Sequence, residues 1–304
     1  MATAQAMIDL STIPVPDAVV VPDSTELVTE LISKYQEIDT IFTAILESDP
    51  SYKLSEAFAY RLVLARQTLN DAVRAVLLAS AGGGDLDQIG ANFDVERMVI
   101  TPADDSTVPP TDAVYESDED FRERIQLAWS KLSTAGAKNS YHYFALSADP
   151  DVLDVRAYGP ETHDKEGRVY LYVLSRTGDG TAPQSLLDIV KAAVNPEEVR
   201  PLTDFVFVYS AELIKYEVEA EVVIPYGLDG DLVMQQAEEA LEAYVESVHR
   251  IDSVAARSGI DRALHQSGVV TVKLISPAAD VEPKMGEAPY CTKITLRKVV
   301  TDYD

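Results

Sequence analysis

The sequence predicts an α+β protein, with an N-terminal helical hairpin or bundle segment followed by two small α+β sandwich domains. Three observations lead to this fold class. Large apolar side chains recur every three or four positions between residues 25 and 80, as they do on amphipathic helices. From about residue 139, segments with helical spacing alternate with strand-like apolar runs. A glycine run and a stretch rich in Pro and Thr separate these two parts, as is typical of domain boundaries.

Residues 1–24 are predicted to form an extended arm. The segment contains Pro14, Pro16 and Pro22 and no basic residue. Proline fixes φ and removes a backbone donor, so a helix is disfavoured here. Asp23 or Ser24 then provides an N-cap for the first helix.

Two helices are expected next, near residues 25–47 and 54–80, with a breaker at 48–51 between them. On each helix an apolar stripe advances by alternating steps of four and three residues, and Lys34 interrupts the first stripe. Two interpretations remain open: either the hairpin closes on itself, or the stripes complete a helical bundle with other chains. We favour the second, because glycines separate the hairpin from the α/β part. The candidate assembly residues are Leu27, Leu31, Ile38, Ile41, Ile45, Phe58, Leu62, Leu69 and Val76.

Gly82–Gly84 follow the second helix and are predicted to form its C-cap and a flexible joint. A phosphate-binding loop is not expected, because a helix rather than a strand precedes the glycines and no Lys follows them. A short helix and turn are expected over 85–97, and a linker over 98–116. The next helix begins at Ser117, where the carboxylates of 118–120 are expected to complement the helix dipole rather than bind a metal.

The rest of the chain predicts two α+β units. The first is expected to contain a helix, two strands, a helix and a strand, over 139–148, 152–158, 168–175, 183–194 and 204–211. The second is expected to contain a strand, two helices and two strands, over 213–225, 230–248, 253–266, 269–276 and 290–299. Glu217, Glu219 and Glu221 alternate with apolar residues, which predicts a half-buried antiparallel strand with one wet face. The predicted domains are therefore the arm at 1–24, a helical segment at 25–97, a linker at 98–116, a first α+β domain at 117–211 and a second at 212–304.

The composition excludes several classes of partner. The chain has 51 acidic and 25 basic residues and a net charge of −26. Nucleic acid and anionic membrane surfaces are therefore not expected partners, because both bind clustered Lys and Arg. The acidity indicates either solubility and repulsion of wrong partners, which we favour, or a halophilic source. A single cysteine, Cys291, cannot form an internal disulfide and is expected to be a core residue. Neither a cleavable export signal nor a membrane span is expected.

No catalytic, cofactor-binding or metal-binding residue is predicted. The four histidines lack metal-ligand spacing with one another or with Cys291. No Gly-x-Ser-x-Gly elbow or Cys/His nucleophile signature occurs. Asp229-Gly230-Asp231 resembles the start of a calcium loop, but a predicted helix occupies the space of the later ligands. We interpret this segment as a turn and N-cap.

Four stretches, taken in order, resemble the baseplate J-like family of contractile phage-type tails. They are Gly84–Arg97, Glu116–Ile125, which is the most specific, Ser133–Val155, and the pair of α+β units with Ser267–Val270 before a late strand. The resemblance covers residue 55 to the C-terminus. The arm at 1–25 has no counterpart that we can match, and the segment at 98–116 is long enough to hold an insertion.

The resemblance implies a mechanical role rather than an enzymatic one. Family members are wedge subunits of a baseplate, the ring around the central spike of a contractile tail, and are assembled in the host bacterial cytoplasm. In such a wedge, two copies of the family member join one copy of a second wedge protein, of the tail protein I type. They join through an N-terminal helical bundle. The sheath-initiating baseplate protein and the central spike or hub proteins are further expected partners. Neighbouring wedges meet through their C-terminal domains, and the ring opens or tilts when the sheath contracts.

Two other classes of function compete with this one. A soluble acidic enzyme, such as a hydrolase, would need an activated nucleophile or a metal set, and the sequence shows neither. A stand-alone binding module would need no apolar stripe between chains and would be a monomer.

Overall fold

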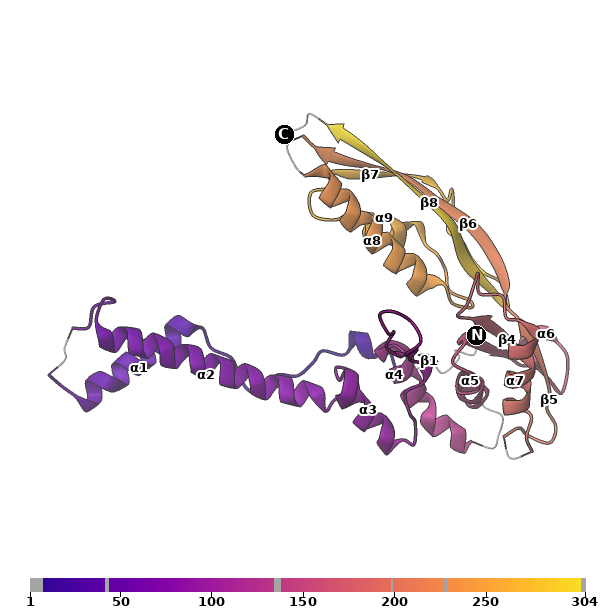
Figure 1. Ribbon diagram of the computed structural model, residues 1–304, viewed down its shortest axis with the longest axis horizontal. Coiled ribbons are helices and arrows are strands. Elements are labelled where there is room, and N and C mark those ends of the chain that lie inside the picture. Colours follow the sequence, from indigo (N-terminus) through magenta and orange to yellow (C-terminus); the bar gives the residue numbers. More distant parts are fainter. Residues whose placement is uncertain (1–7, 42–43, 134–137, 198, 227–228, 302–304) are drawn as a thin grey trace. The chain divides into compact units, whose positions relative to one another are not determined.

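The computed structural model describes residues 8–41, 44–133, 138–197, 199–226 and 229–301. These residues form two compact units (Figure 1). The first holds the chain up to Arg97 together with Ser117–Gln126. The second holds Met98–Glu116 together with the chain from Leu127 onward. The α+β fold class predicted from the sequence is confirmed.

The first unit is helical. It contains the 3₁₀ turn η1 (Leu10–Thr12) and the helices α1 (Ser24–Ile38), α2 (Pro50–Ala75), α3 (Gly83–Asn92) and α4 (Asp118–Leu127). The predicted end of the first helix at residue 47 was wrong. The Asp39 side chain accepts a hydrogen bond from the Ile41 N–H group at 3.2 Å, which closes a turn in place of another helical turn. The second helix also starts earlier than predicted, at Pro50, because proline is favoured at the first helical position.

The segment at 98–116 is not a simple linker. β1 (Val99–Thr101) pairs with β2 (Val114–Tyr115) in an antiparallel hairpin, and an isolated bridge joins Asp104 to Thr111. The Glu116 N–H group donates to the Met98 carbonyl, and the Met98 N–H group donates to the Glu116 carboxylate. The β-branched and aromatic residues at the two ends of the segment favour this pairing.

The first α+β part of the second unit follows the 3₁₀ helix η2 (Ala128–Leu132). Its sheet has the order β3-β4-β5; β3 and β4 are antiparallel, while β5 lies parallel to β4 and is reached through α7. The predicted elements are confirmed within one or two residues. The elements are α5 (Lys138–Leu146), β3 (Val152–Tyr158), α6 (Pro160–His163), β4 (Arg168–Ser175), α7 (Gln184–Val194) and β5 (Phe205–Ser210).

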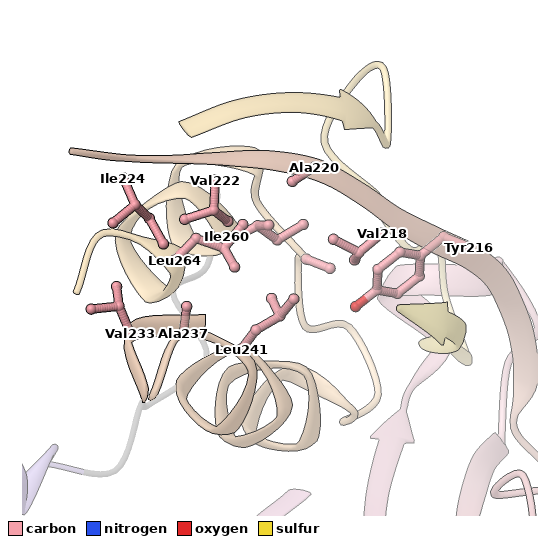
Figure 2. Packing of buried hydrophobic residues seen from close by; sticks show 11 residues of the cluster. Tyr216, Val218, Ala220, Val222, Ile224, Val233, Ala237, Leu241, Ile260 and Leu264 are labelled. Atoms are coloured by element: carbon pink, nitrogen blue, oxygen red, sulfur yellow. The ribbon is translucent and has the colours of Figure 1, made fainter. Parts of the chain in front are cut away.

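The second α+β part has the sheet order β7-β6-β8, with helices on one face. β6 is the central strand. It is antiparallel to β7, as predicted, but its pairing with β8 is parallel. The predicted alternation along β6 is confirmed: Tyr216, Val218 and Ala220 point into the core against the helices (Figure 2). On the other face Glu219 and Glu221 form ion pairs across strands. The elements are β6 (Glu212–Pro225), α8 (Gly230–Val248), α9 (Arg257–Leu264), β7 (Thr271–Ser276) and β8 (Glu287–Thr301).

Specific hydrogen bonds join the two α+β parts within the second unit. The buried Asp154 carboxylate on β3 accepts from the Ile251 N–H group at 2.8 Å. The Tyr158 hydroxyl donates to Asp252 at 2.7 Å and accepts from the Gly286 N–H group at 3.0 Å. An added Cβ on Gly286 would lie 2.5 Å from the Tyr172 ring. The joint is therefore closely fitted, and two parts that are separate in sequence pack as one unit.

Candidate assembly surface

One face of α2 is covered by α1. Leu27 and Val28 of α1 are buried against Ala59, which has no solvent exposure. The spacing of three and four residues places these side chains on one stripe of each helix, and burying them stabilises the hairpin. The partly buried residues around this contact are Leu31, Ile32, Tyr52 and Val63.

The N-terminal arm continues this cover along the second half of the same face. Asn70 is 4% exposed and binds the arm through both polar atoms of its side chain. Its Oδ1 accepts from the Val19 N–H group at 3.0 Å, and its Nδ2 donates to the Val19 carbonyl at 2.9 Å. Arg66 donates to the Val20 carbonyl, and Arg74 pairs with Asp17 at 3.0 Å. The part of the predicted arm around Asp17–Val20 thus docks on α2 through its backbone and the Asp17 carboxylate. Of the rest of the predicted arm, residues 1–7 lie outside the described residues, and Leu10–Thr12 form η1 rather than an extended segment.

The apolar stripe predicted for the second helix lies on a different face of α2 and is exposed. Phe58, Leu62, Leu69 and Val76 are 56%, 42%, 49% and 71% exposed. Consecutive helical residues differ by about 100° around the axis, so this stripe lies beside the face that holds Ala59 and Asn70. We call Phe58, Leu62, Ala65, Leu69, Ala72 and Val76 the α2 stripe. The hairpin and the arm leave it uncovered from Phe58 to Val76, which is the C-cap of α2.

The stripe predicted for the first helix does not form a single surface. Leu27 and Leu31 face α2, whereas Ile38 is 78% exposed at the last position of α1. Ile41 is 83% exposed and Ile45 is half-buried, and both lie outside any helix. The predicted seam therefore fails after Ile38, because the helix ends there. The assembly role of these residues remains a prediction.

The glycine run is held in place rather than free. Arg97 pairs with Asp87 and Asp118, both at 2.7 Å, and lies over the Phe121 ring. Burial by itself would lower the pKa of Arg97, but the two carboxylates raise it. Asp118 also accepts a hydrogen bond from the Gly83 N–H group at 3.1 Å. These contacts tie α3 to α4. The predicted glycine C-cap is wrong, because α2 ends at Ala75 and the glycines begin α3, whereas the flexibility of the joint remains a prediction.

The other features that could suggest chemistry have structural roles. Asp229 caps α8 by accepting from the Leu232 N–H group, as predicted. Ser117 caps α4, and the acidic first turn of that helix contributes Asp118 to the Arg97 cluster. Among the residues that the structure describes, no group of three or more His, Cys, Asp or Glu side chains could hold a metal ion. No helix in the described ranges is long and apolar enough to cross a bilayer.

Comparison with known proteins identifies the family. The chain is 42% identical over 294 residues to baseplate protein J of Escherichia phage P2, covering 94% of this chain and 96% of that protein. The chain belongs to the baseplate J-like family. The family models for the baseplate J-like N-terminal domain and central domain match residues 47–104 and 133–210. The resemblance inferred from the sequence is thus confirmed, although 134–137, within the third of its stretches, lie outside the described residues.

A solved structure is also similar to this baseplate J-like chain. It is a chain of the anti-feeding prophage baseplate, determined by cryo-EM with sixfold symmetry, at 12% sequence identity and a TM-score of 0.42. The match covers 59% of this chain and 43% of that one.

The N-terminal family model includes all of α2, and sequence reasoning missed two residues that organise this region of the baseplate J-like chain. Asn70 lies at helical spacing from Ala59, Val63 and Arg66, on the covered face of α2. A polar residue at a covered position needs a hydrogen-bond partner, and this was the signal that the sequence offered. No sequence pattern indicated the Arg97 cluster, because its partners lie 10 and 21 residues away on different helices.

Proposed function

We propose that this chain is a structural wedge subunit of a baseplate at the foot of a contractile tail. In this proposal the α2 stripe packs against helices of a second copy and of a second wedge protein, of the tail protein I type. The observation that carries the proposal is the exposure of the whole stripe beside a face that α1 and the arm already cover. Each large apolar side chain of this kind stabilises a contact by about 1.5–3 kcal/mol when it is fully buried.

The proposal extends to the rest of the assembly. The baseplate J protein of phage P2 supports a location in the baseplate of a virion or tail-like particle. Assembly in the host cytoplasm, contact with the sheath-initiating protein and with the central spike or hub, and the absence of an enzymatic role belong to the same proposal. The ring would close through the C-terminal domains of neighbouring wedges.

The test is a double substitution in the α2 stripe. Leu62→Asp together with Leu69→Asp should abolish co-assembly with the second wedge protein, because two carboxylates would enter an apolar interface. Co-expressed proteins would be separated by size-exclusion chromatography with light scattering. The thermal unfolding midpoint of the second unit, followed by circular dichroism, should stay unchanged.

The matched control is Tyr60→Asp together with Gln67→Asp. These residues have the same spacing, are also exposed, and lie on the far side of α2 from the stripe. The control should assemble like the wild type. Normal assembly of the Leu62/Leu69 variant, or equal loss in both variants, would contradict the proposed use of the α2 stripe.

A further inference from the structure

The main chain passes from the first α+β part to the second at a single residue. The Ala211 N–H group donates to the Val173 carbonyl of the first sheet. The next N–H group, that of Glu212, donates to the Gly286 carbonyl in the second part. Ala211 lies between β5 and β6 and belongs to neither strand. Rotation about its two backbone dihedrals therefore turns one part against the other while both sheets keep their own hydrogen bonds.

The apolar contact between the two parts is small. Its buried residues are Leu174, Ala211, Ile251 and Ala288, and two of these four are alanine. The core between β6 and its helices contains eleven buried residues (Figure 2). Hydrophobic stabilisation follows the apolar area that is removed from water. Separating the two parts therefore costs less free energy than unfolding the second part.

Buried polar groups hold the two parts together. The Asp154 side chain is 3% exposed and accepts from the Ile251 N–H group at 2.8 Å. Tyr158 is 8% exposed, and its hydroxyl donates to Asp252 at 2.7 Å and accepts from the Gly286 N–H group at 3.0 Å. Hydrogen bonds weaken steeply with distance and angle, so a modest rotation at Ala211 breaks all of these bonds together.

An ion pair also spans this contact, between Lys215 of β6 and Asp179 of the first part. Its atoms lie 3.4 Å apart, and both side chains are more than a third exposed. Exposed pairs of this kind contribute little to stability. The buried bonds of Asp154 and Tyr158 therefore decide whether the two parts stay together.

We propose that the second α+β part is hinged at Ala211, and that Asp154 and Tyr158 form a latch that holds the hinge closed. In the closed arrangement the latch groups bond within the chain, and in the open arrangement they bond to water. Both sheets and their helices stay folded in either arrangement. The chain can thus turn its C-terminal part without unfolding it. This proposal goes beyond the proposed function and does not depend on the α2 stripe.

Two neighbouring amides distinguish opening of the hinge from unfolding. The Ile251 N–H group bonds across the contact to Asp154, whereas the Asp252 N–H group bonds to the Glu287 carbonyl within the second part. Opening exposes only the first of these groups, and unfolding exposes both. In the wild-type full chain the Ile251 amide should exchange at least about tenfold faster than the Asp252 amide, after correction for their intrinsic rates. Hydrogen exchange followed by NMR measures each amide separately.

Tyr158→Phe removes the latch hydroxyl but leaves the bond between Asp154 and Ile251 in place. The hinge should open more often, because the closed arrangement has lost the bonds to Asp252 and Gly286. The Ile251 amide should therefore exchange about tenfold faster than in the wild type. The Asp252 amide should keep its wild-type rate. A cooperative thermal melt of the variant would establish that it is folded.

Tyr244→Phe is the matched control. The Tyr244 hydroxyl also donates to an oxygen and accepts from an N–H group, but both belong to Ala256 within the second part. This variant should leave the ratio of the Ile251 and Asp252 exchange rates unchanged. The proposal is overturned if the two amides exchange equally fast in the wild type, or if Tyr158→Phe leaves the Ile251 rate unchanged. It is also overturned if Tyr244→Phe alters the ratio as much as Tyr158→Phe does.

Discussion

At the scale of single residues, polar side chains decide which segments meet. Asn70 is a polar residue at a covered position of α2, and its amide matches the donor and acceptor of one arm residue, Val19. A carboxylate in the same role, Asp154, links β3 to the segment that follows α8 in the second α+β part. Buried groups of this kind are costly when they lose their partners, so each fixes one arrangement.

Asn70→Ala should release the arm while leaving the hairpin folded. The Val19 amide should exchange with solvent about tenfold faster or more, because a lost hydrogen bond to a buried group costs about 1–3 kcal/mol. Hydrogen exchange read by mass spectrometry measures this directly. Gln67→Ala, at an exposed position of the same helix, serves as the control. Unchanged protection of the arm in Asn70→Ala would show that Arg66 and Arg74 hold it alone.

Asp154 should make the second unit sensitive to acid. Burial by itself would raise the pKa of Asp154, but His142, Arg156 and the Ile251 N–H group hold it below its ordinary value of 3.8. Because the pKa of Asp154 is lower in the folded state, its ionised carboxylate stabilises the fold at pH values above the pKa of the unfolded state. This contribution is lost as pH falls through the folded pKa.

Asp154→Asn should therefore lower the unfolding midpoint at neutral pH, and its deficit against the wild type should shrink as pH falls below about 4. Urea unfolding across a pH series gives this difference. Asp188→Asn, on the exposed side of α7, should show no such trend. A deficit that is constant with pH would mean that the substitution at Asp154 disturbs packing rather than removing a stabilising charge.

At the scale of elements, charged side chains convert a glycine-rich joint into a fixed turn. Gly83 adopts a φ of +52°, and Asp118 accepts from its N–H group. Arg122 donates to the carbonyls of Leu78 and Ala81, just before the glycines. These hydrogen bonds connect α4 to α3 and to the segment that follows α2, although glycine residues alone would predict flexibility between the helices.

Arg97→Ala should increase the mobility of α3 relative to α4. Removing the guanidinium leaves Asp87 and Asp118 without their shared partner, so α3 amides should exchange several-fold faster while those of β6 stay unchanged. Arg61→Ala, an exposed arginine on α2, is the control. Equal exchange of α3 in both variants would show that the glycines, and not Arg97, set the mobility of the joint.

At the scale of the whole molecule, the two compact units divide the chain differently from the sequence prediction. α4 up to Gln126 groups with the N-terminal helices, whereas the predicted boundary at 117 placed this helix with the first α+β domain. The hairpin over 98–116 groups with the second unit. The predicted domain boundaries therefore remain a prediction that fragment expression can test.

A fragment over 127–304 should fold without the N-terminal helices. It lacks the β1–β2 hairpin but keeps the two three-stranded sheets, their helices and the joint made by Asp154 and Tyr158. Its thermal melt should be cooperative, and its midpoint should match that of the second unit in the full chain. The sequence-based fragment 139–304 should be less stable, because it lacks η2, which packs against α5. A non-cooperative melt of both fragments would mean that the helical unit is needed for folding.

The sequence by itself determined the main helices and strands outside 98–116, most of their bounds in the α+β part, the alternation along β6 and the membership of the family. Periodicity and order along the chain carry these features, and both are local properties. Tertiary structure alone decided that β6 runs parallel to β8, that the α2 stripe is exposed while Leu27 is buried, and that Arg97 fixes the glycine turn. Each of these depends on which surfaces meet across a long sequence separation. An apolar stripe has the same spacing whether its partner lies in the same chain or in another.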